Sequence, residues 1–103
     1  MSRKKVMAGL ELLDEFIVRA CRDPRIAISH IGLFAVLAAQ WERQGRKNPL
    51  HVFARQVMTL CRISSSATYH KRIHELSDYG YLRFEVSFKK NVPSRIYLLP
   101  LSE

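Results

Sequence analysis

The side chains best suited to chemistry lie in the run S-S-S-A-T-Y-H-K-R-I-H over residues 64–74. A serine beside a base can act as a nucleophile, and His70 and His74, one helical turn apart, could bind zinc together with His51 and Cys61. However, the chain has no G-x-S-x-G, C-x-x-C or H-E-x-x-H motif, and cations flank the histidines. It also lacks a Walker loop, a dinucleotide fingerprint and a carboxylate pair in an apolar pattern. We therefore expect no enzymatic activity, no metal and no cofactor.

The same run also fits one face of a helix that contacts nucleic acid. Tyr69, Ile73 and Leu76 recur at i, i+4 and i+7, which predicts a helix over 65–79 with one apolar stripe, capped by a serine at 64–65. The predicted outer face carries Ser65, Ser66, Thr68, Lys71 and Arg72, with His70 and His74 at its edges. Hydroxyls at a helix start, followed by cations, suit contact with phosphates and guanine edges, although an ordinary solvated face has a similar composition.

Two strands are predicted after this helix. Gly80 would end the helix, and Y-L-R-F-E-V-S-F over 81–88 then alternates in polarity. The alternation predicts Leu82, Phe84, Val86 and Phe88 on one face and Tyr81, Arg83, Glu85 and Ser87 on the other. The turn K-K-N-V-P-S carries Lys89 and Lys90 and leads to a partner strand over 95–99.

Helix, glycine, strand, basic turn and strand in this order predict a winged helix-turn-helix. Helix 65–79 would lie in the major groove of DNA, and wing 89–95 would lie on the backbone or in the minor groove. The predicted fold class is α+β, mainly helical, with a small antiparallel wing sheet of two or three strands. A short β-prone stretch at 50–53 would provide the third strand.

The elements upstream are predicted to support this unit. Helices are expected over 9–21, 29–44 and 54–61, after a flexible basic tail at 1–8, and the single winged-helix domain would span 9–103. Ser29 and Gly45 would cap the two ends of the second helix. Apolar side chains at helical spacing are Leu10, Leu13, Ile17 and Ala20 in the first helix, with Leu12 and Phe16 alongside. In the second helix Ile31, Leu33, Phe34, Val36, Leu37 and Trp41 cover most of the circumference, and in the third the predicted buried face carries Val57, Met58, Leu60 and Cys61.

Composition limits the class of protein. The 103 residues suit one domain, and the net charge of +8 makes a polyanionic partner plausible. The chain has no apolar run long enough to span a membrane, and acids near its start interrupt any signal-peptide core, so we expect a cytoplasmic protein. Cys21 and Cys61 are predicted to be buried thiols rather than a disulfide.

The segment I-S-S-S-A-T-Y-H-K-R-I-H-E-L-S-D-Y-G-Y-L-R-F-E-V-S-F, preceded by L-F-A-V-L-A-A-Q-W, resembles two related groups. One is the small helix-turn-helix proteins of Bacteroidetes and their mobile elements, which share a similar A-T-Y-H-K segment. The other, more distant, is the N-terminal winged helix of DnaD-like replication initiation and phage replisome-organiser proteins. The similarity covers about residues 26–99 and is strongest over 63–88. The wing turn K-K-N-V-P-S lacks the glycine expected near its end.

This resemblance implies a winged-helix fold and DNA binding in transcriptional regulation or in mobile-element replication and transfer. The helix that such proteins turn toward DNA would carry Ser65, Ser66, Thr68, His70 and Lys71. From residues and resemblance together, the candidate contacts with double-stranded DNA are Arg55, Ser65, Ser66, Thr68, His70, Lys71, Arg72, Lys89, Lys90 and Arg95.

Two other functions stay open from the sequence. A replication-associated module would mainly bind protein partners, with Phe16, Trp41 and Tyr97 as candidate contacts. RNA binding through the same basic face is a third hypothesis, although the chain lacks the exposed aromatic platform typical of single-stranded RNA binders. The first two helices also carry enough apolar surface for a homodimer.

Overall fold

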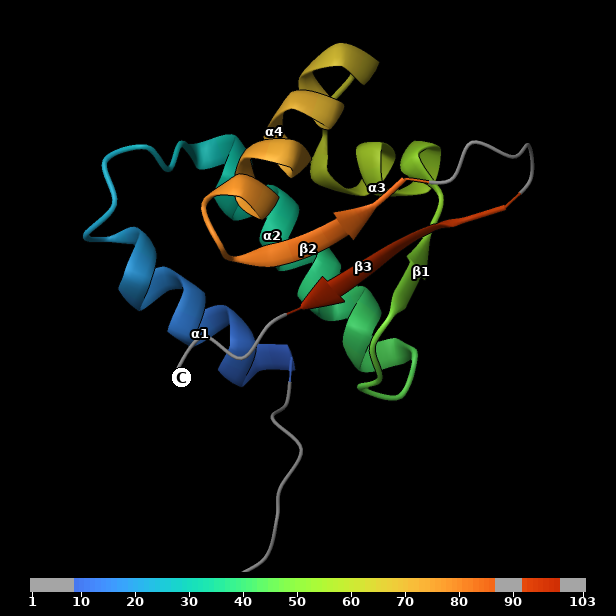
Figure 1. The fold of residues 1–103 in the computed structure, drawn as a ribbon, viewed down its shortest axis with the longest axis horizontal. Coiled ribbons are helices and arrows are strands. Elements are labelled where there is room, and N and C mark those ends of the chain that lie inside the picture. The colour runs from blue at the N-terminus through green and yellow to red at the C-terminus, as the bar shows by residue number, and fades with distance from the viewer. Residues whose placement is uncertain (1–8, 87–91, 99–103) are drawn as a thin grey trace, which may run out of the picture.

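The computed structural model describes residues 9–86 and 92–98. The elements in these ranges, shown in Figure 1, are α1 (Gly9–Ala20), α2 (Ile28–Arg43), β1 (Leu50–Val52), α3 (Ala54–Cys61), α4 (Ser66–Asp78), β2 (Leu82–Glu85) and β3 (Ser94–Leu98). The predicted α+β, mainly helical class is confirmed. Within the described ranges, no helix is long and apolar enough to cross a membrane. The predicted tail at 1–8 lies outside them.

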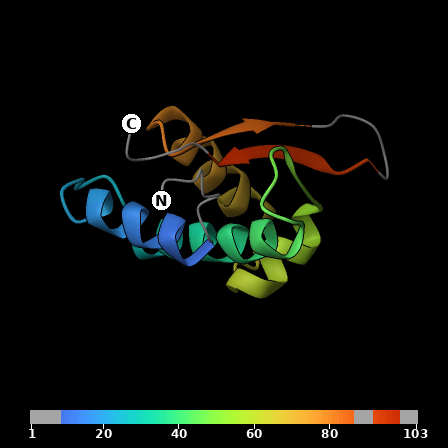
Figure 2. The same cartoon turned by 90° about the horizontal axis from the view of Figure 1, so that it is seen from below.

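The strands form one antiparallel sheet in the order β1-β3-β2, so the described strand that comes last in the chain lies in the middle. Ile96 of β3 pairs with Leu50 of β1 on one side and with Phe84 of β2 on the other. Figure 2 shows the sheet as one layer and helices α1 and α2 as the other. The short strand predicted at 50–53 is therefore β1, the third strand of the sheet.

The core lies between these layers and contains stacked aromatic rings. Phe16 of α1 stacks on Phe34 of α2 with ring centroids 4.2 Å apart, and Tyr81 meets Phe16 edge-on at 5.1 Å. Trp41 is only 6% exposed, which confirms that it packs in the core instead of presenting its indole for base stacking. Burial of such large apolar surfaces is the main free-energy gain of folding.

Helix α2 begins one residue earlier than predicted and is capped differently. Its N-cap residue is Ala27, whose backbone N–H donates to Nδ1 of His30 at 2.8 Å. Ser29 therefore lies within the first turn, and its predicted capping role is wrong. The predicted ends at Gly45 and Gly80 are confirmed, because both glycines adopt left-handed backbone conformations with φ of +90° and +89°.

Three predicted core positions in the helical half are wrong. Leu10 is 78% exposed, because the fully buried stripe of α1 runs through Leu12 and Phe16. Leu60 is 48% exposed on the outer side of α3. Cys21 follows the end of α1 and is exposed, whereas Cys61 is half-buried, and both thiols are free. The periodicity thus located the helices correctly, but in α1 and α3 the predicted apolar set included one exposed position each.

Tyr81 was predicted on the outer face of the sheet, and this is also wrong. Because β2 begins only at Leu82, the alternation does not extend to Tyr81, which is buried. Its hydroxyl donates to Oδ2 of Asp23 at 2.8 Å. Arg25 also donates to this carboxylate, and these bonds hold the pKa of Asp23 well below its usual range despite partial desolvation. The cluster fastens the loop between α1 and α2 to the start of the sheet.

Candidate nucleic-acid interface

A short turn joins α3 to α4 and determines how α4 starts. Arg62 closes α3 in the left-handed backbone conformation, with φ of 62°. Ser65 is the N-cap residue of α4, and its Oγ accepts a hydrogen bond from the N–H of Thr68 at 3.2 Å. The prediction that a serine at 64–65 caps this helix is therefore confirmed.

Helix α4 turns its apolar stripe of Tyr69, Ile73 and Leu76 into the core, as predicted. Burial raises the pKa of Tyr69 to about 12. All seven residues of the predicted outer face are exposed or half-buried: Ser65, Ser66, Thr68, His70, Lys71, Arg72 and His74. Polar side chains are therefore accessible along the whole length of α4.

A hollow of about 660 Å³ lies between α3 and the start of α4. Arg55 and Arg62 line it from the α3 side, and Ser64 and Ser66 line it from the α4 side. The hollow brings together two predicted candidates, Arg55 and Ser66. It adds Arg62 and Ser64, which the sequence-based set omitted. Their position in the sequence, between two predicted helices, could have identified them as candidates.

Positive charge dominates this part of the chain. Between Glu42 and Glu75 the sequence contains no aspartate or glutamate but seven cations: Arg43, Arg46, Lys47, Arg55, Arg62, Lys71 and Arg72. Among the described residues, no carboxylate lies within salt-bridge distance of Arg55, Arg62 or Lys71. The hollow and the first half of α4 therefore carry positive charge that no described carboxylate neutralises at salt-bridge distance.

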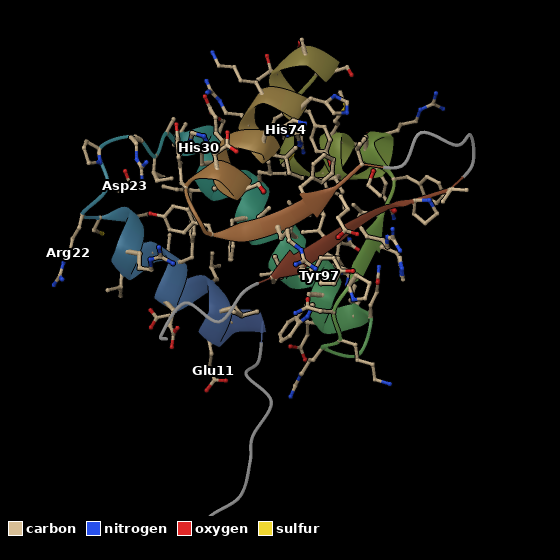
Figure 3. All side chains as sticks on the ribbon, viewed as in Figure 1. Glu11, Arg22, Asp23, His30, His74 and Tyr97 are labelled. Atoms are coloured by element: carbon tan, nitrogen blue, oxygen red, sulfur yellow. The ribbon has the colours of Figure 1, made fainter. Side chains whose placement is uncertain are left out.

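The second half of α4 is held to α2 by a polar network. Glu75 accepts a hydrogen bond from Nη1 of Arg72 at 2.9 Å and lies 2.7 Å from Nε2 of His30, which is 1% exposed. Since Nδ1 of His30 accepts from a backbone N–H, the proton of the neutral ring must be on Nε2, which donates to Glu75. Arg72, and secondarily His30, lowers the pKa of Glu75. Arg72 is thus the one predicted contact on α4 that already has a carboxylate partner within the described residues. Figure 3 shows His30 beside α4.

The histidines and the cysteine considered above as zinc ligands make other contacts. Nδ1 of His70 lies 2.9 Å from the carbonyl oxygen of Ser66, and the His74 ring meets Phe84 edge-on at 5.1 Å. Burial raises the pKa of Cys61, which disfavours the thiolate that binds metals. Over residues 9–86 and 92–98, no group of three or more His, Cys, Asp or Glu side chains could hold a metal ion.

Predicted contacts on the sheet are only partly described. Arg95 is exposed on β3, with Nε 3.4 Å from Oε1 of Glu85. Arg83 stacks over the ring of Tyr97, which is labelled in Figure 3, with its Cζ 4.2 Å from the ring centroid. Lys89 and Lys90 lie outside the described residues, so the predicted tip of the wing stays a prediction.

Comparison of the chain with protein families, with curated proteins and with solved structures finds no match. Function is therefore inferred from these residues and their geometry.

Proposed function

We propose that this chain is a winged helix-turn-helix protein that binds double-stranded DNA, as a transcriptional regulator or as an accessory factor of a mobile element. Helices α3 and α4 form the helix-turn-helix, α4 enters the major groove, and β2 and β3 are the strands of the wing. The short turn between α3 and α4 supports this assignment. The antiparallel pairing of β1 with β3 also supports it, since a short strand ahead of the two helices is expected to join the wing sheet.

One observation carries the proposal: the first half of α4, with the exposed Lys71, lies beside a hollow whose arginines have no carboxylate partner among the described residues. The major groove is about 12 Å wide and admits an α-helix. On such a helix, Lys71 can reach a phosphate or a guanine edge, and the hydroxyls of Ser66 and Thr68 can contact phosphates or bases. Arg55 lies on the adjacent α3 and would contact the backbone beside the groove.

The alternative of a module that mainly binds proteins loses most of its predicted contacts. Phe16 is fully buried and Trp41 nearly so, which means that neither side chain can touch a partner, and their proposed role is wrong. Tyr97 is half-buried and remains accessible on the sheet.

A fluorescence-anisotropy titration with duplex DNA over a salt series tests the proposal. Counterion release predicts that log affinity falls linearly with log salt, with a slope of about −0.9 for each phosphate neutralised. Lys71→Ala should weaken binding. If Lys71 reads bases, the loss should be larger on a duplex selected from a random library than on random DNA. Lys89→Ala with Lys90→Ala should instead weaken binding to all sequences and flatten the slope.

Lys47→Ala is the matched control, because Lys47 is an exposed cation without a described carboxylate partner in the loop between α2 and β1. In Figure 1 that loop lies at the opposite end of the molecule from the start of α4. Failure of the wild-type protein to bind duplex DNA at low salt would sink the proposal. Equal losses of DNA affinity for Lys71→Ala and Lys47→Ala would contradict the placement of α4 in the interface.

A further inference from the structure

Two residues other than glycine have a positive φ within the described ranges, and both are arginines. Arg46 and Arg62 each have φ of 62°. In this left-handed region the Cβ atom of an L-residue crowds the following carbonyl oxygen, whereas glycine has no such clash. Each arginine therefore stands at a position where glycine would suit the backbone better.

The side chain of Arg46 has a visible role inside the molecule. Its Nη2 lies 2.7 Å and its Nε lies 2.9 Å from Oε2 of Glu42, one turn earlier on α2. The other carboxylate oxygen of Glu42 accepts the backbone N–H of Gly9 at 2.8 Å, which ties α2 to the start of α1. The hydrogen bonds from Arg46, and then that from Gly9, lower the pKa of Glu42. The guanidinium of Arg46 thus offsets part of its backbone strain through an internal ion pair.

The side chain of Arg62 has no comparable partner among the described residues. It is exposed and lines the hollow between α3 and α4, and no described carboxylate lies within salt-bridge distance. Arg55 lines the same hollow and is equally unpaired. Two arginines thus line one concave surface whose lining residues include no aspartate or glutamate. Their positive charges would attract a negatively charged group from outside the chain.

We propose that Arg62 binds a backbone phosphate of DNA and that the hollow between α3 and α4 receives this phosphodiester, with Arg55 as the second cation. The inference rests on the proposed DNA-binding function and adds to it a phosphate contact at the turn. Guanidinium groups suit this role, because their parallel N–H donors bind two phosphate oxygens at once. A glycine at position 62 would satisfy the turn, but only a side chain such as arginine supplies this contact.

The test compares Arg62→Gly with Arg46→Gly, which remove the same charge from the same backbone conformation. Affinity for duplex DNA is measured by anisotropy over a salt series, and unfolding is followed by circular dichroism. Arg62→Gly should weaken binding about tenfold on every sequence, as expected for loss of a charge-assisted hydrogen bond. The slope of log affinity against log salt should become less steep by about 0.9. Arg62→Lys, which retains the charge, should recover most of the slope but only part of the affinity.

Thermal unfolding distinguishes a binding role from a structural one. Relief of strain stabilises Arg62→Gly, whereas the greater freedom of glycine in the unfolded chain destabilises it. Its midpoint should therefore stay within about 4 °C of the wild type. Arg46→Gly should unfold at a lower temperature than Arg62→Gly, because it also loses the ion pair with Glu42, while its DNA affinity should change little.

The outcomes separate this inference from the function on which it rests. If the wild-type protein does not bind duplex DNA at low salt, both proposals fail. If it binds and the two glycine variants bind equally well, Arg62 is not a phosphate contact, although DNA binding stands. Preference of the wild-type protein for an RNA duplex over the DNA duplex of the same sequence would likewise overturn the assignment of the phosphate to DNA.

Discussion

Helix α4 has two halves that differ in what their polar side chains contact. In the first half, Lys71 is exposed without a described carboxylate partner, and Ser66 lines the hollow shared with α3. In the second half, Arg72 and Glu75 form an ion pair that continues to the buried His30 of α2. The two adjacent cations of this helix therefore lie in opposite situations, one open to an external partner and one held inside the protein.

Residue type alone therefore does not identify a binding residue. A cation that is already paired with a carboxylate of the protein contributes to the fold. A cation without such a partner is available to bind an anionic ligand. Substitutions in the second half of α4 are thus expected to change the free energy of unfolding. Those of exposed polar residues in the first half are expected to change binding, with one exception at the cap, whereas Tyr69 in the same half is part of the core.

Ile73→Ala, in the second half of the helix, should reduce stability the most. Ile73 is fully buried, so removing its side chain leaves a cavity and should lower the free energy of unfolding by about 3 kcal/mol. Urea unfolding followed by the fluorescence of Trp41, the only tryptophan, measures this change. The folded fraction should bind DNA with wild-type affinity. A tenfold loss of affinity without a loss of stability would break the division between the halves.

A smaller effect is expected for Glu75→Gln, which keeps the shape of the side chain but removes its charge. The charge-assisted hydrogen bonds to Arg72 and His30 weaken, so the free energy of unfolding at pH 7 should fall by about 1.5 kcal/mol. Since the pKa of Glu75 is lowered in the folded protein, this stabilisation is fully present above the ordinary glutamate pKa of about 4.3. It is lost as the pH falls through the lower folded value.

The difference between wild type and Glu75→Gln should therefore shrink in urea titrations carried out from pH 7 down to about pH 3, since protonation also neutralises the wild-type carboxylate. A difference that stays constant over this range would show that the charge of Glu75 does not contribute to stability.

The smallest of these effects is predicted for Ser65→Ala, at the cap of the open half. Loss of the bond from the Thr68 N–H to Oγ of Ser65 should lower the free energy of unfolding by about 1 kcal/mol. Ser64→Ala is the matched control, because Ser64 is exposed and does not cap the helix, and it should change stability by less than about 0.5 kcal/mol. Equal effects of the two substitutions in urea unfolding would exclude capping as the main role of Ser65.

Local patterns were sufficient to predict the order of helices and strands. Apolar spacing located α4 and its buried stripe, and the glycines at 45 and 80 marked two helix ends correctly, because these features depend on the backbone and on near neighbours. Even the pairing of Arg72 with Glu75 was accessible in principle, since residues three apart lie on the same side of a helix.

Contacts between distant segments were not predictable in this way. His30 and Glu75 are 45 residues apart, and Tyr81 and Asp23 are 58 residues apart, so no periodic pattern connects them. The first contact anchors the carboxylate of the Arg72–Glu75 pair to α2, and the second holds a buried tyrosine that alternation assigned to the outside. The hollow lined by Arg55 and Arg62 likewise depends on the angle between two helices, which a single sequence does not encode as a pattern.

The position of β3 in the sheet has a consequence for synthesis on the ribosome. Both β1 and β2 pair only with β3 in the described sheet, yet β3 is made after them. A nascent chain that has not yet extended to residues 94–98 therefore exposes two unpaired strands, while all four described helices are already complete. Strands without partners are prone to associate with other chains. Stalled or shortened products should accordingly be more prone to aggregation than the finished protein, and β1 and β2 are the segments expected to associate with other chains.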